Sequence, residues 1–150
     1  MSSLDKKLKI YLAGSMSACD SFEEMNEWRV AMTVELLKRA DIHDYVLNVL
    51  NPVSLFNFEE VKYESQREVK EYDLVHVLSS DIVIVDLNKI EQSPGTIIEL
   101  QKAKDNYIPV LSIGKADVYS NLHPWINDCI THNFETGTEL ADHISYFYLI

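Results

Sequence analysis

The sequence is poor in the residues that mark disordered or disulfide-stabilised chains. Its 150 residues include four glycines, four prolines and two cysteines. So little glycine and proline argues against low complexity. Cys19 and Cys129 have no partners at metal-ligand spacing, and two cysteines do not make a disulfide framework. We therefore expect one domain spanning residues 1–150 in a reducing, cytoplasmic setting.

Positive charge is scarce, and so are several ligand-binding motifs. Thirteen Lys and Arg against 24 Asp and Glu give a formal net charge of -11, which argues against a nucleic acid polymer as partner. No apolar run reaches the length of a membrane span, and MSSLDKK at the N-terminus lacks a signal-peptide core, so we expect no membrane association. The five histidines show no HExxH spacing, which predicts no metal site, and no GxGxxG pattern marks a dinucleotide site.

Apolar strand-like runs alternate with helical patterns along the chain. We predict strands over residues 8–13, 45–50, 81–87, 108–113 and 130–134. Helices are predicted over residues 22–40 and 61–79, from a turn at 93–96 to about 106, and over 138–148, with a short helix start at 123–125 and loops over 53–60 and 114–121. The unbroken run DIVIVDL indicates a strand buried on both faces. This order predicts an α/β fold: a single-domain Rossmann/flavodoxin-like sandwich of about five mostly parallel strands, with helices on both faces.

The stretch from residue 87 to 103 follows the most apolar predicted strand. Ligands of open α/β sheets bind where strands end and helices begin. Glu99 falls in the first two turns of the following helix, where the helix dipole favours an ionised carboxylate. Such a carboxylate acts as a nucleophile or electrostatic stabiliser, or it simply decorates a helix start. Gly14, after the first strand, similarly fits either a plain turn or a close approach to a ligand.

Two further charged residues have alternative interpretations. Asp73 lies beside a predicted apolar stripe formed by Val69, Tyr72, Val75 and Leu78. A carboxylate there is costly unless it is paired or functional, and His76, one turn on, is its candidate partner. Arg29 could reach a phosphate, but we favour a solvated or snorkelling side chain. Phe56 and Phe58 either stack on a ring or cover the core.

Five short motifs occur in order along most of the chain. They are KIYLAGS (9–15), DL (73–74), SD (80–81), SPGTIIEL (93–100) and IPV (108–110). Together they resemble the nucleoside 2-deoxyribosyltransferase family, which includes the 2'-deoxynucleoside 5'-monophosphate N-hydrolases. The resemblance implies that Glu99 is the nucleophile that attacks C1' of the sugar, that Asp73 protonates the leaving base, and that Tyr11 positions Glu99. It further implies a sugar site walled by Gly14, Ser15 and Gly95, with no cofactor.

Ser93 departs from the transferase pattern. By the resemblance, transferases usually carry an Asp at this position for the sugar 5'-hydroxyl, whereas the nucleotide hydrolases carry a serine for the 5'-phosphate. A neutral hydroxyl accommodates a phosphate dianion that an Asp would repel. Ser93 therefore favours the hydrolase alternative.

Retaining cleavage of a glycosidic bond requires one nucleophilic carboxylate and one acid/base carboxyl group. We expect burial to raise the pKa of Asp73 and the helix N-terminus to hold down the pKa of Glu99, which would split the two roles.

The resemblance also implies a homodimer or larger homo-oligomer, with Ser120, Asn121 and His123 as candidates for a contact that bridges subunits. The apolar tail, residues 146–150, fits such an interface or docks on its own domain.

The predicted function is cleavage of the N-glycosidic bond of 2'-deoxynucleosides or their 5'-monophosphates through a glycosyl-Glu99 intermediate, with transfer of the sugar to a free nucleobase. The first alternative is hydrolysis of the 5'-monophosphates, with water as acceptor. A second alternative is a non-catalytic nucleotide-binding module on the same fold, since fold does not guarantee activity. A glycohydrolase of another nucleotide, such as NAD, is a third.

Overall fold

The computed structural model describes residues 6–16, 18–54 and 66–150. Five strands form one parallel sheet in the order β2-β1-β3-β4-β5. The strands are β1 (Lys7–Ala13), β2 (Val46–Leu50), β3 (Ile82–Asp86), β4 (Val110–Ile113) and β5 (His132–Phe134). The predicted α/β class with five strands is confirmed, and every pairing within this sheet is parallel.

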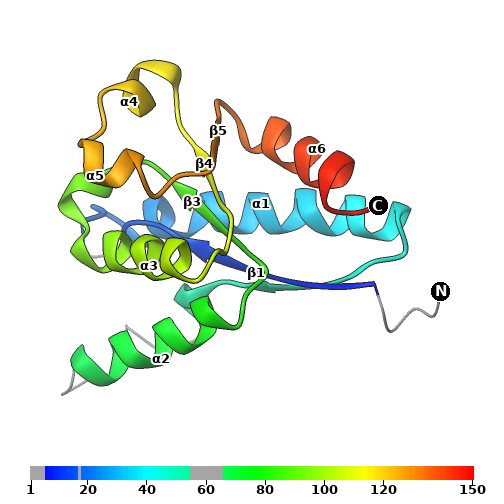
Figure 1. Ribbon diagram of the computed structural model, residues 1–150, viewed down its shortest axis with the longest axis horizontal. Helices are drawn as coiled ribbons and strands as arrows, with labels where there is room; N and C mark the ends of the chain where they lie inside the picture. Colours follow the sequence, from blue (N-terminus) through cyan, green and yellow to red (C-terminus); the bar gives the residue numbers. More distant parts are fainter. Residues whose placement is uncertain (1–5, 17, 55–65) are drawn as a thin grey trace.

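Helices cover both faces of the sheet. They are α1 (Phe22–Ile42), α2 (Gln66–Leu78), α3 (Pro94–Asp105), α4 (Ala116–Ser120), α5 (Pro124–Asn127) and α6 (Gly137–Phe147). Short 3₁₀ turns lie at Pro52–Ser54 and Ile90–Gln92. Helices α1 and α6 lie together on one face, and α2 and α3 lie on the other (Figure 1). In the part of the chain that the structure describes, no helix is long and apolar enough to cross a membrane.

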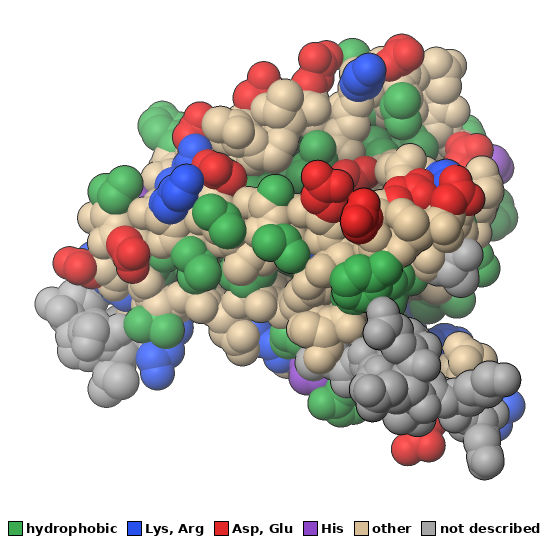
Figure 2. Space-filling view, turned by 180° about the vertical axis from the view of Figure 1, so that it is seen from behind, with side chains coloured by type: hydrophobic (Ala, Val, Ile, Leu, Met, Phe, Trp, Pro, Cys, Tyr) green, Lys and Arg blue, Asp and Glu red, His purple; other side chains and the backbone are tan. Residues whose placement is uncertain are grey.

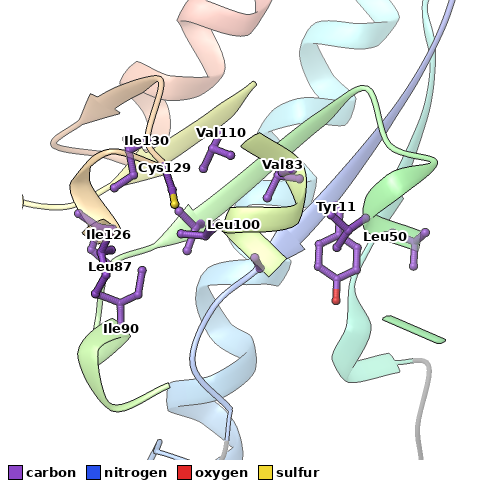
Figure 3. Packing of buried hydrophobic residues seen from close by; sticks show 14 residues of the cluster. Tyr11, Leu50, Val83, Leu87, Ile90, Leu100, Val110, Ile126, Cys129 and Ile130 are labelled. Carbon is purple, nitrogen blue, oxygen red and sulfur yellow. The ribbon is translucent and has the colours of Figure 1, made fainter. Parts of the chain in front are cut away.

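The alternation of side chains along β1 divides the core into two clusters. Ile10 and Leu12 point into the cluster under α1 and α6. Tyr11 and Ala13 point into the opposite cluster, which α2, α3 and α5 cover (Figure 3). Residues 82 to 85 of β3 are 0% exposed, which confirms the prediction of a strand buried on both faces. Tyr11 is thereby placed on the same face of the sheet as α3, the helix that carries Glu99.

Helix α1 begins where its capping residues predict. The Glu24 backbone N–H donates to Ser21 Oγ at 3.1 Å, and the Glu24 carboxylate accepts the Asp20 N–H at 2.6 Å. The buried side of the helix carries Arg29, Met32, Leu36 and Ala40. Phe22, at the first helical position, is 54% exposed.

Three sequence predictions about elements are wrong or only partly met. The predicted loop over 114–121 contains α4, whose five residues are too few to show a helical period. The predicted stripe of α2 is on the wrong side, since Val75 is 62% exposed whereas Val77 is buried. In the C-terminal tail Leu149 docks on its own domain, while Tyr146 and Ile150 stay exposed. Phe56, Phe58 and the predicted helical residues 61–65 lie outside the described residues.

Candidate active site

The carboxyl ends of β1 and β3 are adjacent, and the chain leaves them toward opposite faces of the sheet. After β1 it enters α1 on one face, and after β3 it enters α3 on the other. Such a topological switch point is where open α/β sheets bind their ligands. The predicted site residues come from β1, from the loops that follow β1 and β3, and from α2 and α3.

Glu99 lies in the second turn of α3, with part of its carboxyl group out of contact with solvent. Among the described residues, its Oε2 atom is buried and has no hydrogen-bond partner. The pKa of Glu99 is raised to about 8, mainly because the carboxyl group is buried; the charge of Asp73 contributes to the rise, while the Tyr11 hydroxyl and Arg29 oppose it. The expectation of a lowered pKa is therefore wrong. The helix dipole acts mainly within the first turn, and here desolvation outweighs it.

Asp73 lies on the packed side of α2, one turn before the buried Val77. Burial raises its pKa to about 6, in the direction that the sequence predicts. The predicted pairing with His76 is wrong: Asp73 Oδ1 and His76 Nε2 are both buried, and neither has a hydrogen-bond partner among the described residues. The imidazole of His76 lies instead at 3.5 Å from Lys9 Nζ and edge-on to Tyr72.

Tyr11 is 0% exposed, and its hydroxyl points away from the neighbouring apolar side chains (Figure 3). Burial raises its pKa, and so do the negative charges of Glu99 and Asp73. The phenol therefore stays neutral and keeps its proton to donate. Tyr11 lies near enough to Glu99 for each to alter the other's pKa, yet in the described part of the chain its hydroxyl forms no hydrogen bond.

A cavity of about 160 Å³ lies between α2 and α3. Its wall contains Asp73 and Glu99 together with Gly95, Gln66, Val69, Lys70, Leu74 and Ile98. The structure thus brings Asp73, Glu99 and Gly95 to one cavity, with the Tyr11 hydroxyl close to both carboxyl groups. Buried polar atoms without partners are rare in folded proteins and call for an explanation. Two such atoms belong to Asp73 and Glu99 in the cavity wall, and a third belongs to Tyr11, whose charge interactions link it to both carboxyl groups. Together they indicate a place where a ligand completes the hydrogen bonding.

Ser15 and Ser93 lie together at the carboxyl edge of the sheet. Their hydroxyl oxygens are 2.6 Å apart, and the Ser15 hydroxyl donates to the Asn88 carbonyl at 2.7 Å. Ser93 Oγ also lies 3.0 Å from the Lys89 carbonyl. Each serine has one hydroxyl proton, and both protons have acceptors within the protein. A ligand anion would have to displace one of these bonds to receive a proton from either serine.

The two predicted glycines differ in what they allow. Gly14 has a φ of 154°, and a Cβ there would lie 2.8 Å from Trp28 Cζ2. This turn therefore requires glycine for reasons of packing. A Cβ on Gly95 would meet nothing within 4 Å, although Gly95 borders the cavity. Gly95 is thus the one of the two that leaves space beside the carboxyl groups.

A second cavity, of about 390 Å³, was not predicted from the sequence. Ser15, Trp28 and Asp86 line it, together with Cys19, Glu23, Glu24, Glu27, Ala31 and Asn88. Acidic side chains outnumber basic ones on this side of the molecule (Figure 2), and nearby Lys89 is paired with Glu24 at 2.8 Å and Asp20 at 3.1 Å. Burial raises the pKa of Asp86. The position of Asp86 as the last residue of β3, at the ligand-binding edge, is the signal that could have identified it.

Arg29 does not snorkel to solvent, so the favoured interpretation of this residue is wrong. Its side chain is 0% exposed and lies at 4.8 Å from the ring centroid of Trp28. Its Nη2 donates to the Gly14 carbonyl at 3.0 Å. An amphipathic pattern places a residue on the buried face, but it cannot show that backbone carbonyls at the end of a strand will bind a guanidinium there.

The three candidates for a subunit contact lie around the junction of α4 and α5. Asn121 Nδ2 donates to the Asp117 carbonyl at 2.7 Å, and the His123 backbone N–H donates to Glu91 Oε1 at 2.9 Å. Ser120 Oγ donates to the same Asp117 carbonyl at 3.3 Å. These bonds fix the local loop, and the role of the three residues in an assembly stays a prediction.

No protein-family model matches the sequence, and no curated protein matches it. Solved structures do share its fold. A conserved protein from Enterococcus faecalis V583 superposes with a TM-score of 0.68 at 15% identity, covering 93% of this chain and 98% of that one. A 2-deoxyribosyltransferase from Bacillus psychrosaccharolyticus gives 0.61 at 19% identity, with 89% and 90% covered. A CMP N-glycosidase from Clostridium botulinum gives 0.56 at 14% identity, with 93% and 98% covered.

At these identities the likeness establishes the fold. The chain has the fold of the deoxyribosyltransferase and the N-glycosidase over nearly its whole length. The fold predicted from the sequence resemblance is therefore confirmed. The roles of Glu99, Asp73, Tyr11, Gly14, Ser15, Ser93 and Gly95 stay predictions.

Proposed function

We propose that this protein is an enzyme that cleaves the N-glycosidic bond of 2'-deoxynucleosides, with Glu99 as nucleophile. The observation that carries the proposal is the convergence of Glu99, Asp73 and Tyr11, each with a buried polar atom that lacks a hydrogen-bond partner among the described residues. A nucleophile and an acid/base group around one cavity are what retaining glycoside chemistry requires. Two of the proteins that share this fold are a 2-deoxyribosyltransferase and a CMP N-glycosidase, which supports the same reaction class.

The reaction proceeds in two steps. In the first, a Glu99 carboxylate oxygen forms a bond to C1' as the bond between C1' and the base nitrogen breaks. The bonding electron pair leaves with the base, which takes a proton from the Asp73 carboxyl group. In the second step an acceptor base, or water, attacks C1' and releases the Glu99 carboxylate. The Asp73 carboxylate takes the acceptor's proton, so each turnover restores both groups. Tyr11, held neutral, keeps a proton with which to bind and orient the Glu99 carboxylate once the substrate is in place.

The two carboxyl groups share protons in the free site. Burial raises the pKa of Glu99 to about 8 and that of Asp73 to about 6, so near neutral pH the pair holds one proton. Attack on C1' requires that proton on Asp73 and the carboxylate form of Glu99. Binding of the nucleoside must favour this arrangement.

A second candidate function is hydrolysis of 2'-deoxynucleoside 5'-monophosphates, which the serine at position 93 favours. Two observations weigh toward free nucleosides. The hydroxyl protons of Ser93 and Ser15 already have acceptors within the protein. The cavity next to Ser15 is lined by Asp86 and three glutamates, which would repel a phosphate dianion.

We further propose that the enzyme acts on these small molecules and free nucleobases as a homodimer or larger homo-oligomer.

Product chromatography tests the function. Deoxynucleosides and their 5'-monophosphates are incubated with and without a free acceptor base, using wild type, Glu99→Gln and the exposed control Glu139→Gln. We expect base exchange with deoxynucleosides, at least about 10³-fold slower in Glu99→Gln and unchanged in Glu139→Gln. Free base released from monophosphates without acceptor would instead identify the hydrolase. Binding without turnover in wild type, or equal turnover in wild type and Glu99→Gln, would refute the proposed mechanism.

A further inference from the structure

A buried cation that the proposed chemistry does not use lies beside the site. Arg29 is 0% exposed, and no carboxylate of the described residues forms an ion pair with it. A buried charge without a counter-ion is costly unless other groups stabilise it. Such a residue therefore needs either strong polar contacts or a functional reason, and here the structure provides both.

The contacts of the Arg29 guanidinium are backbone carbonyls. Its Nε donates to the Leu12 carbonyl at 3.3 Å and its Nη2 to the Gly14 carbonyl at 3.0 Å. Its Nη1 donates to the carbonyl of Met25, one turn earlier in α1. Leu12 lies near the end of β1, the strand that carries Tyr11, and Gly14 begins the turn that leads to Ser15. The guanidinium therefore ties α1 to the carboxyl end of β1 from the face opposite α3.

The charge of Arg29 also reaches the proposed nucleophile. Glu99 is influenced by Tyr11 from β1, by Asp73 from α2 and by Arg29 from α1, and among these Arg29 is the cation. It lowers the pKa of Glu99, against the rise that burial and Asp73 produce. The other acid near Arg29 is Asp86 at the end of β3, whose pKa Arg29 also lowers. Removal of Arg29 should therefore disfavour the carboxylate form of Glu99.

We propose that Arg29 is a positioning residue of this site: its buried guanidinium fixes the end of β1 that carries Tyr11 and places a positive charge there. The inference rests on the proposed role of Glu99 as nucleophile. It assigns a task to a residue outside the motifs that carry the family resemblance.

The test compares Arg29→Met and Arg29→Lys with wild type. Methionine fills a similar volume without the charge, and an apolar residue in place of a buried ion is often tolerated. Lysine keeps the charge but cannot reproduce the fork of donors. Arg39→Met is the control, because Arg39 lies on the same helix and pairs at the surface with Glu35 and Asp142. The primary measurement is a ¹³C NMR titration of the Glu99 carboxyl carbon, assigned by the loss of its signal in Glu99→Gln.

In Arg29→Met we expect the Glu99 titration to move upward by about one pH unit, with the alkaline limb of kcat/KM moving by the same amount. In Arg29→Lys we expect the titration near its wild-type position with a lower kcat, and in Arg39→Met neither changes. A Glu99 titration unmoved in Arg29→Met would overturn the proposal. If Arg29→Met fails to fold, a shift of a full unit in the folded Arg29→Lys would overturn it. The titration needs no substrate, so a wild type without turnover would refute the proposed function while leaving this measurement intact.

Discussion

At the scale of single residues, the site is governed by burial more than by the helix dipole. Glu99 and Asp73 are raised in pKa to about 8 and about 6, because both carboxyl groups lose contact with water. Tyr11 is raised for the same reason, so it remains a donor. A site built in this way holds one proton over two carboxyl groups, and its chemistry depends on which group carries it.

The pH dependence of kcat/KM follows from this arrangement. The reactive form contains one proton on the pair, so activity rises with pH through about 6 and falls above about 8. In Asp73→Asn only Glu99 remains to bind the proton. We therefore expect kcat/KM to lose its decline at alkaline pH and to show a single rise at the pKa of Glu99. The value of kcat/KM should drop about 10²- to 10⁴-fold, and less for substrates whose base leaves without protonation. An alkaline limb retained in Asp73→Asn would show that another group is the acid.

At the scale of elements, the strands were easier to predict than the faces of the helices. The unbroken DIVIVDL run indicated a strand buried on both faces, and β3 is one. Helix α2 has apolar residues on two sides, so a period of 3.6 fits either. The sequence pattern favoured the side with Val75, whereas the structure buries Val77. The family resemblance therefore indicated that Asp73 belongs to the site, whereas the helical periodicity placed it only beside the buried face of α2.

Other parts of the site depend on contacts between elements distant in sequence. The hydrogen bond between Ser15 and Ser93 joins residues 78 positions apart, and Arg29 binds carbonyls of β1. No local pattern encodes such pairs. The lowered pKa expected for Glu99 failed for the same reason, because the sequence shows where a helix starts but not how deeply the side chain is buried.

The turn between β1 and α1 gives a prediction at this scale. In Gly14→Ala the new Cβ would meet Trp28 at 2.8 Å, and the φ of 154° disfavours any side chain. We expect a loss of roughly 1–3 kcal/mol of unfolding free energy in urea titrations. The matched change Gly95→Ala meets open space. It should stabilise α3 by about 0.5 kcal/mol, since alanine favours a helix, while raising KM because it narrows the cavity. Equal losses of stability in the two variants would contradict this account.

At the scale of the whole molecule, the order β2-β1-β3-β4-β5 places β1, which carries Tyr11, and β3, whose following loop leads to α3, away from both edges of the sheet. Ile10 and Leu12 bury against one layer of helices and Tyr11 against the other, so the site shares its residues with the core. Ionisation inside such a site acts on the stability of the entire fold.

Stability against pH tests that coupling. The pKa of Glu99 is about 8 in the folded protein and near 4.5 when unfolded, so the folded state binds the proton more tightly. Its contribution to stability is fully present below pH 4.5 and is lost as the pH rises through about 8. The variant Glu99→Gln cannot ionise at this position, so it avoids this loss of stability at high pH. Its unfolding temperature should match that of wild type near pH 4 and exceed it by roughly 5 °C at pH 9. Calorimetry at both pH values measures the difference. A gap that stayed constant with pH would mean that Glu99 ionises in the folded protein as easily as in water, and the raised pKa of Glu99 would then be wrong.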